Sequence, residues 1–233
     1  MILDSNVSGL RLDPIPNRSN WLRVVTATDE NQLWRWQEKG LSEIQKKRLD
    51  ALTSLRHPFF LLPLLKTMPN GELYLIESRE KLSLREALDR LDESAHIHLA
   101  AQLCHGVQTL RSLLPAMWRY HGQICIDAIS VNAGGQLKLG GFALEPRTDD
   151  DEGLFECLRA ILDSAVQRPN IAQLLDKVET LRPFQIRDVL IRELLGEDLG
   201  NISSNLRLAV QAPMHFETHG LLEESQRLLL EQE

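Results

Sequence analysis

The stretch from Ser94 to Leu114 constrains the fold more than any other part of this sequence. Its apolar residues recur three, four and seven positions apart, at Ile97, Ala100, Leu103, Cys104, Val107, Leu110 and Leu114. This spacing is typical of an α-helix that is buried along one stripe. Such a helix needs a core on its apolar side, so we expect a globular domain built around a long central helix.

The segment that follows, from His121 to Ala143, carries a second pattern. Protein kinases have a catalytic loop that reads H-R-D-L-K-P-x-N, then a short strand pair, then the metal-binding motif D-F-G. Aligned without gaps, His121 falls on the histidine, Ile124 on the leucine and Phe142 on the phenylalanine of these motifs. The segment therefore resembles the centre of a protein kinase.

The same alignment replaces the residues that carry kinase chemistry. Gln123 stands at the catalytic aspartate, Cys125 at the lysine, Ala128 at the metal-binding asparagine and Gly141 at the D-F-G aspartate. In the family these groups orient the substrate hydroxyl, neutralise charge and hold magnesium. Because none of the four replacements can take over the lost role, the resemblance implies a pseudokinase.

Other motifs follow in the family's order, from about residue 21 to about residue 166. The run Leu52–Phe60 resembles the end of the kinase C-helix and the turn into the fourth strand. Pro69–Glu77 resembles the hairpin and fifth strand that lead to the hinge, and Ser83–Leu88 fits the short helix after it. Ser94–Leu114 matches the central helix of the large lobe. This shared order is more specific than any single motif.

The nucleotide-binding residues of the small lobe are replaced as well. If Gln32–Gln37 matches the third strand, Gln37 stands at the ATP-binding lysine and Arg35 at a small alanine. Counting back from the turn after the C-helix puts Arg48 at the glutamate that would pair with that lysine. No G-x-G-x-x-G motif precedes Trp21, although backbone amides need glycine to approach phosphates closely. The resemblance thus implies no nucleotide and no other cofactor.

Residues that support the kinase architecture are retained. The family's internal spine consists of the catalytic-loop histidine, the D-F-G phenylalanine, an apolar C-helix residue and an aspartate that opens a buried helix. These positions correspond to His121, Phe142, Leu52 and Asp151. Only Ala143–Thr148 separates Phe142 from the acidic run that follows, so we expect a shortened activation segment.

The expected fold is α+β, with the two lobes of a protein kinase. Residues 1–78 would form a small β-rich N-lobe with one helix, residues 79–200 a mainly helical C-lobe, and residues 201–233 a C-terminal helical extension. Further helices are predicted at Asp151–Val166, Ile171–Leu181, Pro183–Leu195 and Gly220–Glu233.

Composition restricts the partners and the compartment. A net charge of −7 and a pI near 5.6 argue against nucleic-acid binding. No apolar run approaches the roughly 20 residues that span a bilayer, and the first residues lack the pattern of a signal peptide. The three cysteines, Cys104, Cys125 and Cys157, are expected to be free thiols of a cytoplasmic protein. The acidic run Asp149–Glu152 suits a helix start better than a metal site.

Two apolar groups are candidate partner surfaces. Trp34 and Trp36 alternate with polar residues, so a strand would send both to the face opposite Arg35 and Gln37. Leu221, Leu222, Leu228 and Leu229 share one face of the predicted last helix. Each group either packs against the rest of the chain or binds a protein partner, which includes a second copy of the chain.

The leading functional hypothesis is a catalytically inactive pseudokinase that serves as a protein-binding scaffold or an allosteric regulatory subunit. A non-kinase helical adaptor is one alternative. An atypical nucleotide-binding enzyme on a kinase fold is the other, although Gln37 and Gly141 count against it.

Overall fold

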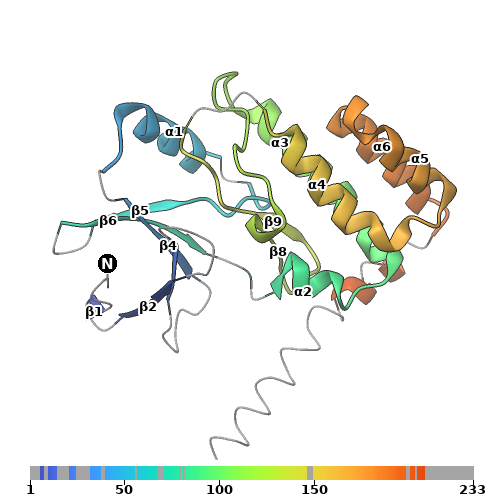
Figure 1. The fold of residues 1–233 in the computed structure, drawn as a ribbon, viewed down its shortest axis with the longest axis horizontal. Helices are drawn as coiled ribbons and strands as arrows, with labels where there is room; N and C mark the ends of the chain where they lie inside the picture. Colours follow the sequence, from blue (N-terminus) through green and yellow to red (C-terminus); the bar gives the residue numbers. More distant parts are fainter. Residues whose placement is uncertain are drawn as a thin grey trace, which may run out of the picture.

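The computed structural model describes residues 6–7, 10–14, 21–24, 32–37, 40–55, 57–67, 71–78, 80, 82–145, 149–197, 200–202 and 204–207, with the backbone alone before residue 40 and at Ser78. The fold is α+β, with one six-stranded and one three-stranded antiparallel sheet, which confirms the α+β part of the expected fold. In Figure 1 the six-stranded sheet and helix α1 lie on one side, helices α3–α6 lie on the other, and strands β8 and β9 run between them.

The six-stranded sheet is formed by the first third of the chain. Its strands are β1 (Asn6–Val7), β2 (Leu10–Pro14), β3 (Trp21–Val24), β4 (Gln32–Gln37), β5 (Leu64–Thr67) and β6 (Leu73–Ser78), in the order β1-β2-β3-β4-β6-β5. The predicted hairpin before the hinge corresponds to β5 and β6, with Leu64 paired to Ile76. Strand β4 lies in the middle of the sheet, with Trp34 opposite Ile76 and Gln37 opposite Leu73.

Helix α1 (Glu43–Thr53) crosses from β4 to β5 along the chain. Ser42 begins it with a capping box, in which its hydroxyl accepts from the Gln45 amide and the Gln45 side chain accepts from the Ser42 amide. The three-stranded sheet consists of β7 (Leu82–Ser83), β8 (Ile129–Val131) and β9 (Leu137–Leu139). Phe60 pairs with Leu139 of β9, so the chain just before β5 is tied to the smaller sheet.

Helix α3 (Glu93–Leu113) is the central helix, and its predicted apolar stripe is confirmed. Ile97, Ala100, Leu103, Cys104, Val107, Leu110 and Leu114 are all buried. Around it lie α2 (Leu84–Leu88), α4 (Asp151–Leu162), α5 (Pro169–Lys177) and α6 (Pro183–Leu194), together with three short 3₁₀ turns, Ile126–Ala128, Asp163–Ala165 and Val178–Thr180. The predicted helices at Ser94–Leu114, Asp151–Val166, Ile171–Leu181 and Pro183–Leu195 therefore exist, with ends shifted by a few residues.

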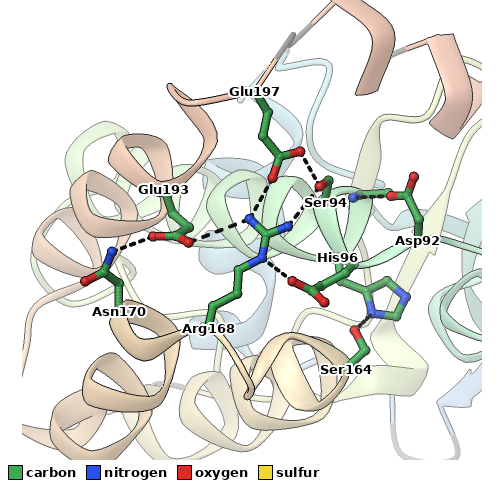
Figure 2. A network of polar contacts seen from close by, with 10 residues as sticks. Asp92, Ser94, His96, Ser164, Arg168, Asn170, Glu193 and Glu197 are labelled. Atoms are coloured by element: carbon green, nitrogen blue, oxygen red, sulfur yellow. Dashed lines mark hydrogen bonds and ion pairs between the residues drawn. The ribbon is translucent and has the colours of Figure 1, made fainter.

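An ionic network holds the helical side together (Figure 2). Arg168, the residue before α5, donates from Nε to Glu93 at the start of α3 and from Nη1 to Glu197 beyond α6, at 2.6 Å. Glu193 of α6 lies 3.6 Å from the same Nη1, and Ser94 binds both Arg168 and Glu197. One arginine thus connects the start of α5 to α3, which lies far away in sequence, and to α6.

Helix α4 begins at Asp151, nine positions after Phe142, which leaves a short connection where the resemblance predicts a shortened activation segment. None of the helices in the described ranges is long and apolar enough to cross a membrane. The predicted last helix, with Leu221, Leu222, Leu228 and Leu229, lies outside the described residues.

Candidate functional site

The segments that resemble the kinase loops meet helix α1 and strand β6 at one place, which we call the central junction. It comprises Arg48, Glu77, His121, Gly141, Phe142 and Asp150. Arg48 lies in α1 and Glu77 in β6, and the other four residues lie in the loops next to β8 and β9 and just before α4. All four charged or titratable side chains among them are buried.

Arg48 binds backbone carbonyl groups on two segments. Its Nε donates to the carbonyl of Ala143 at 2.6 Å and its Nη1 to that of Trp118 at 2.7 Å. Its Nη2 donates to Tyr120 at 2.5 Å and to His121 at 3.3 Å. Burial lowers the pKa of the guanidinium, while the carboxylates of Asp150 and Glu145 oppose that shift. At the position matched to the C-helix glutamate, the chain therefore has a cation that positions backbone.

Asp150 binds backbone amide groups of the same segment. Its carboxylate accepts from the amides of His121 and Gly122, both at 2.5 Å. Burial raises the pKa of Asp150, and these two hydrogen bonds oppose the shift. Arg48 and Asp150 therefore hold one stretch of backbone between a buried cation and a buried anion.

The aspartate that contacts the loop is the residue before the predicted spine aspartate. Asp151 opens α4, as predicted, but its side chain is 44% exposed and lies 2.6 Å from Arg111. Asp151 is the first residue of α4, whereas Asp150 precedes the helix and points back to His121. The sequence could not distinguish the two, because both belong to one acidic run.

His121 is buried and neutral. Its Nδ1 accepts from the Gln123 amide at 3.2 Å, which assigns the proton to Nε2, and Nε2 then donates to the Gly140 carbonyl at 2.9 Å. Burial lowers the pKa of His121 to about 3. A histidine with both ring nitrogens bonded to backbone and no access to solvent positions the loop and cannot exchange protons with a substrate.

Aromatic rings continue from His121 toward the six-stranded sheet. The rings of His121 and Phe142 lie 4.3 Å apart between centroids, and Phe60 meets Phe142 edge-on at 5.9 Å. Leu52, the predicted spine residue of α1, is fully buried in the same core. No sequence motif marks Phe60 as part of this row, although the aromatic pair after His57-Pro58 is a usable signal.

Glu77, like Asp150, is a residue of the junction that the sequence did not identify. It lies near the end of β6, is 1% exposed, and its Oε2 accepts from the Gly141 amide at 2.8 Å. Gly140 and Gly141 leave room for this carboxylate, because a Cβ on Gly140 would lie 3.3 Å from Oε2. A single acidic residue in an apolar strand and a Gly-Gly pair elsewhere are weak sequence signals. They can be recognised as one contact only when the fold is known.

The positions matched to the catalytic groups are partly brought together. Gly141, with φ of +75°, lies against Ala128, so that a Cβ on Gly141 would be 3.1 Å from the Ala128 Cβ. Gln123 is exposed and Cys125 is half-buried. In the described part of the chain no group of three or more histidine, cysteine, aspartate or glutamate side chains could hold a metal ion.

Some predicted site residues are not described as side chains. Gln37, Trp34 and Trp36 lie in β4, where the backbone places them opposite Leu73, Ile76 and Tyr74. The match of Gln37 to the ATP-binding lysine of kinases therefore stays a prediction.

No protein-family model matches the chain, and no curated protein matches it either.

Proposed function

We propose that this chain is a catalytically inactive protein with a kinase-like fold, and that it acts through protein binding as a scaffold or regulatory subunit. The observation that carries the proposal is the bond between Glu77 and the Gly141 amide. Gly141 matches the aspartate that holds magnesium in kinases, and here its amide faces a buried carboxylate.

The charges of the central junction support the absence of phosphotransfer. A triphosphate next to the Glu77 carboxylate would meet like charge in a poorly solvated place. Each of the three nitrogens of Arg48 already donates to a backbone carbonyl. The Arg48 guanidinium therefore binds backbone and does not point its donors at a phosphate.

The missing chemical groups support the same proposal. Kinases hold magnesium through an asparagine and an aspartate, and Ala128 and Gly141 offer no oxygen ligand from a side chain. Gln123 cannot accept a proton from a substrate hydroxyl, because its side chain is a neutral amide. His121, Phe142 and Asp150 retain the contacts that hold such a loop in shape.

A row of apolar residues across the six-stranded sheet supports protein binding. The register aligns Trp34 of β4 with Ile76 of β6, and Ile76 with Leu64 of β5. Leu64 ends this apolar row at the last strand of the sheet, and it is 62% exposed. Edge strands with exposed apolar side chains are sites where partners add a strand or pack a side chain.

The proposal is tested by incubating the purified protein with γ-labelled ATP, magnesium or manganese, and a general protein substrate. Gln123→Ala is the matched control, since Gln123 is exposed and its loss should not harm the fold. We expect the same background incorporation for both proteins. Incorporation that disappears in Gln123→Ala would overturn the proposal and favour the atypical enzyme.

A further inference from the structure

A cavity of about 480 Å3 opens on the helical side, away from the central junction. Its apolar walls come from Phe59, from Ala101 of α3, from Leu137 of β9, and from Ile191 and Leu194 of α6. Cavities of this size and character commonly hold a ligand or the side chains of a docked segment.

An exposed apolar stripe on α6 extends the cavity into a groove. Phe184, Ile191 and Leu195 are 40%, 40% and 67% exposed. They lie seven and four positions apart, so they share one face of the helix. Ile191 belongs to both the stripe and the cavity wall. We call the cavity and this neighbouring stripe together the groove.

The described chain comes to an end beside this groove. Leu206 is buried and packs over Gly135, since a Cβ on Gly135 would lie 2.7 Å from the Leu206 Cγ. Gln136 and Leu137, the next two residues, line the cavity. The chain thus leaves the described part at Arg207 close to the groove, with residues 208–233 still to follow.

The remaining sequence contains a segment that complements the groove. Leu221, Leu222, Leu228 and Leu229 repeat at a spacing of seven, which puts them on one face of a helix. The 13 residues between Arg207 and Leu221 can span up to about 40 Å when extended, so reach does not limit docking.

Charge favours the same match. The segment Gly220–Glu233 carries four glutamates against one arginine. The cavity is lined by His98, His105 and Arg187, and none of its described lining residues is acidic. Burial lowers the pKa of His98, and Arg187 also binds Asp188 on its own helix at 3.0 Å, so the basic character of the groove is weak.

We propose that Gly220–Glu233 docks as an amphipathic helix into the groove between α3 and α6 of its own chain, with the leucine face inward. This docking covers the apolar stripe of α6 and closes the cavity. It is independent of the proposed function, because the groove shares no residue with the central junction. A partner helix of similar pattern would have to displace the segment to bind there.

Hydrogen exchange on the full chain tests the proposal. Leu222→Glu combined with Leu229→Glu charges the leucine face, and we expect the amides of Ile191–Leu195 to exchange at least tenfold faster than in the parent protein. Ile191→Glu, which changes an exposed residue of the groove, should have the same effect. Leu230→Glu is the matched control, since Leu230 points away from the leucine face and should leave exchange unchanged.

Two results would overturn the proposal. Equal exchange in the parent and in both groove and leucine variants would mean that the segment does not dock and that the groove is open to another molecule. Protection that rises with protein concentration, with a molar mass above 26.5 kDa by light scattering, would mean that the segment docks on a second copy.

Discussion

Two charged side chains determine the geometry of the central junction at the residue scale. Arg48 binds the carbonyl groups of Trp118, Tyr120 and His121. Asp150 binds the amides of His121 and Gly122. A buried carboxylate with two amide donors is costly to remove, because the amides and the nearby guanidinium lose their partner.

We therefore expect Asp150→Asn to lower the free energy of unfolding by about 2–4 kcal/mol. The asparagine keeps the size of the side chain but turns an NH2 group toward a backbone amide. Asp151→Asn is the matched control, and its half-exposed ion pair with Arg111 should be worth less than about 1 kcal/mol. Urea unfolding measures both, and equal losses would contradict the assignment of the buried role to Asp150.

Close backbone contacts determine how the elements fit together. Helix α4 approaches the chain after Gln123 so closely that a methyl group on Gly153 would overlap the carbonyl oxygen of Ile124. Because that atom belongs to the backbone, it cannot turn aside as a side chain would. Gly153 therefore permits the packing of α4 against this loop.

Gly153→Ala is expected to destabilise the fold by about 1–3 kcal/mol, although alanine normally favours a helix. Gly196→Ala is the control, because nothing lies within 4 Å of the added methyl group, and it should stay within about 0.5 kcal/mol of the parent. Thermal or urea unfolding gives both values. A neutral or stabilising Gly153→Ala would show that α4 can move away from Ile124 at no cost.

The elements were easier to predict from the sequence than the contacts between them. Helix α3 was found because a buried stripe repeats at 3.6 residues, a local signal that tertiary structure only reinforces. Asp150 was missed because the choice between neighbouring aspartates depends on where α4 begins relative to His121. Glu77 was missed because its partner, Gly141, lies 64 positions away.

The groove was beyond prediction for the same reason. It joins the loop after α1, the middle of α3, the turn before β9 and the exposed face of α6, and no local pattern marks such a meeting. The sequence did identify the leucine face of the last segment. It could not show that a complementary groove lies near the point where that segment departs.

Buried histidines make the stability of the whole molecule depend on pH. Burial lowers the pKa of His96, His98 and His121, the last to about 3. Their unfolded pKa is about 6.5, so below that pH the unfolded chain binds more protons at these residues than the folded chain does. The stability that these residues contribute is fully present above pH 6.5 and is lost as the pH falls below it.

We expect the free energy of unfolding to fall between pH 7.5 and pH 5.5, with His121 alone contributing about 1.4 kcal/mol per pH unit below 6.5. Asp150 opposes this loss of stability at lower pH. Because its pKa is raised in the folded state, the folded chain binds a proton there at a higher pH than the unfolded chain does. His121→Gln, which cannot titrate, should show a smaller loss. Urea unfolding at the two pH values tests this, and a stability that rises toward pH 5.5 would contradict it.

The most direct test of the central proposal is thermal unfolding with and without millimolar ATP, ADP or GTP, each with magnesium, manganese or no metal. A ligand at a hundred times its dissociation constant adds about 2.7 kcal/mol, which is worth roughly 5–10 °C in a chain of this size. With Glu77 at the Gly141 amide and Arg48 committed to backbone, we expect no shift above about 1 °C, well below that range. A shift of several degrees with any nucleotide would contradict the proposal and show that the junction still binds phosphates.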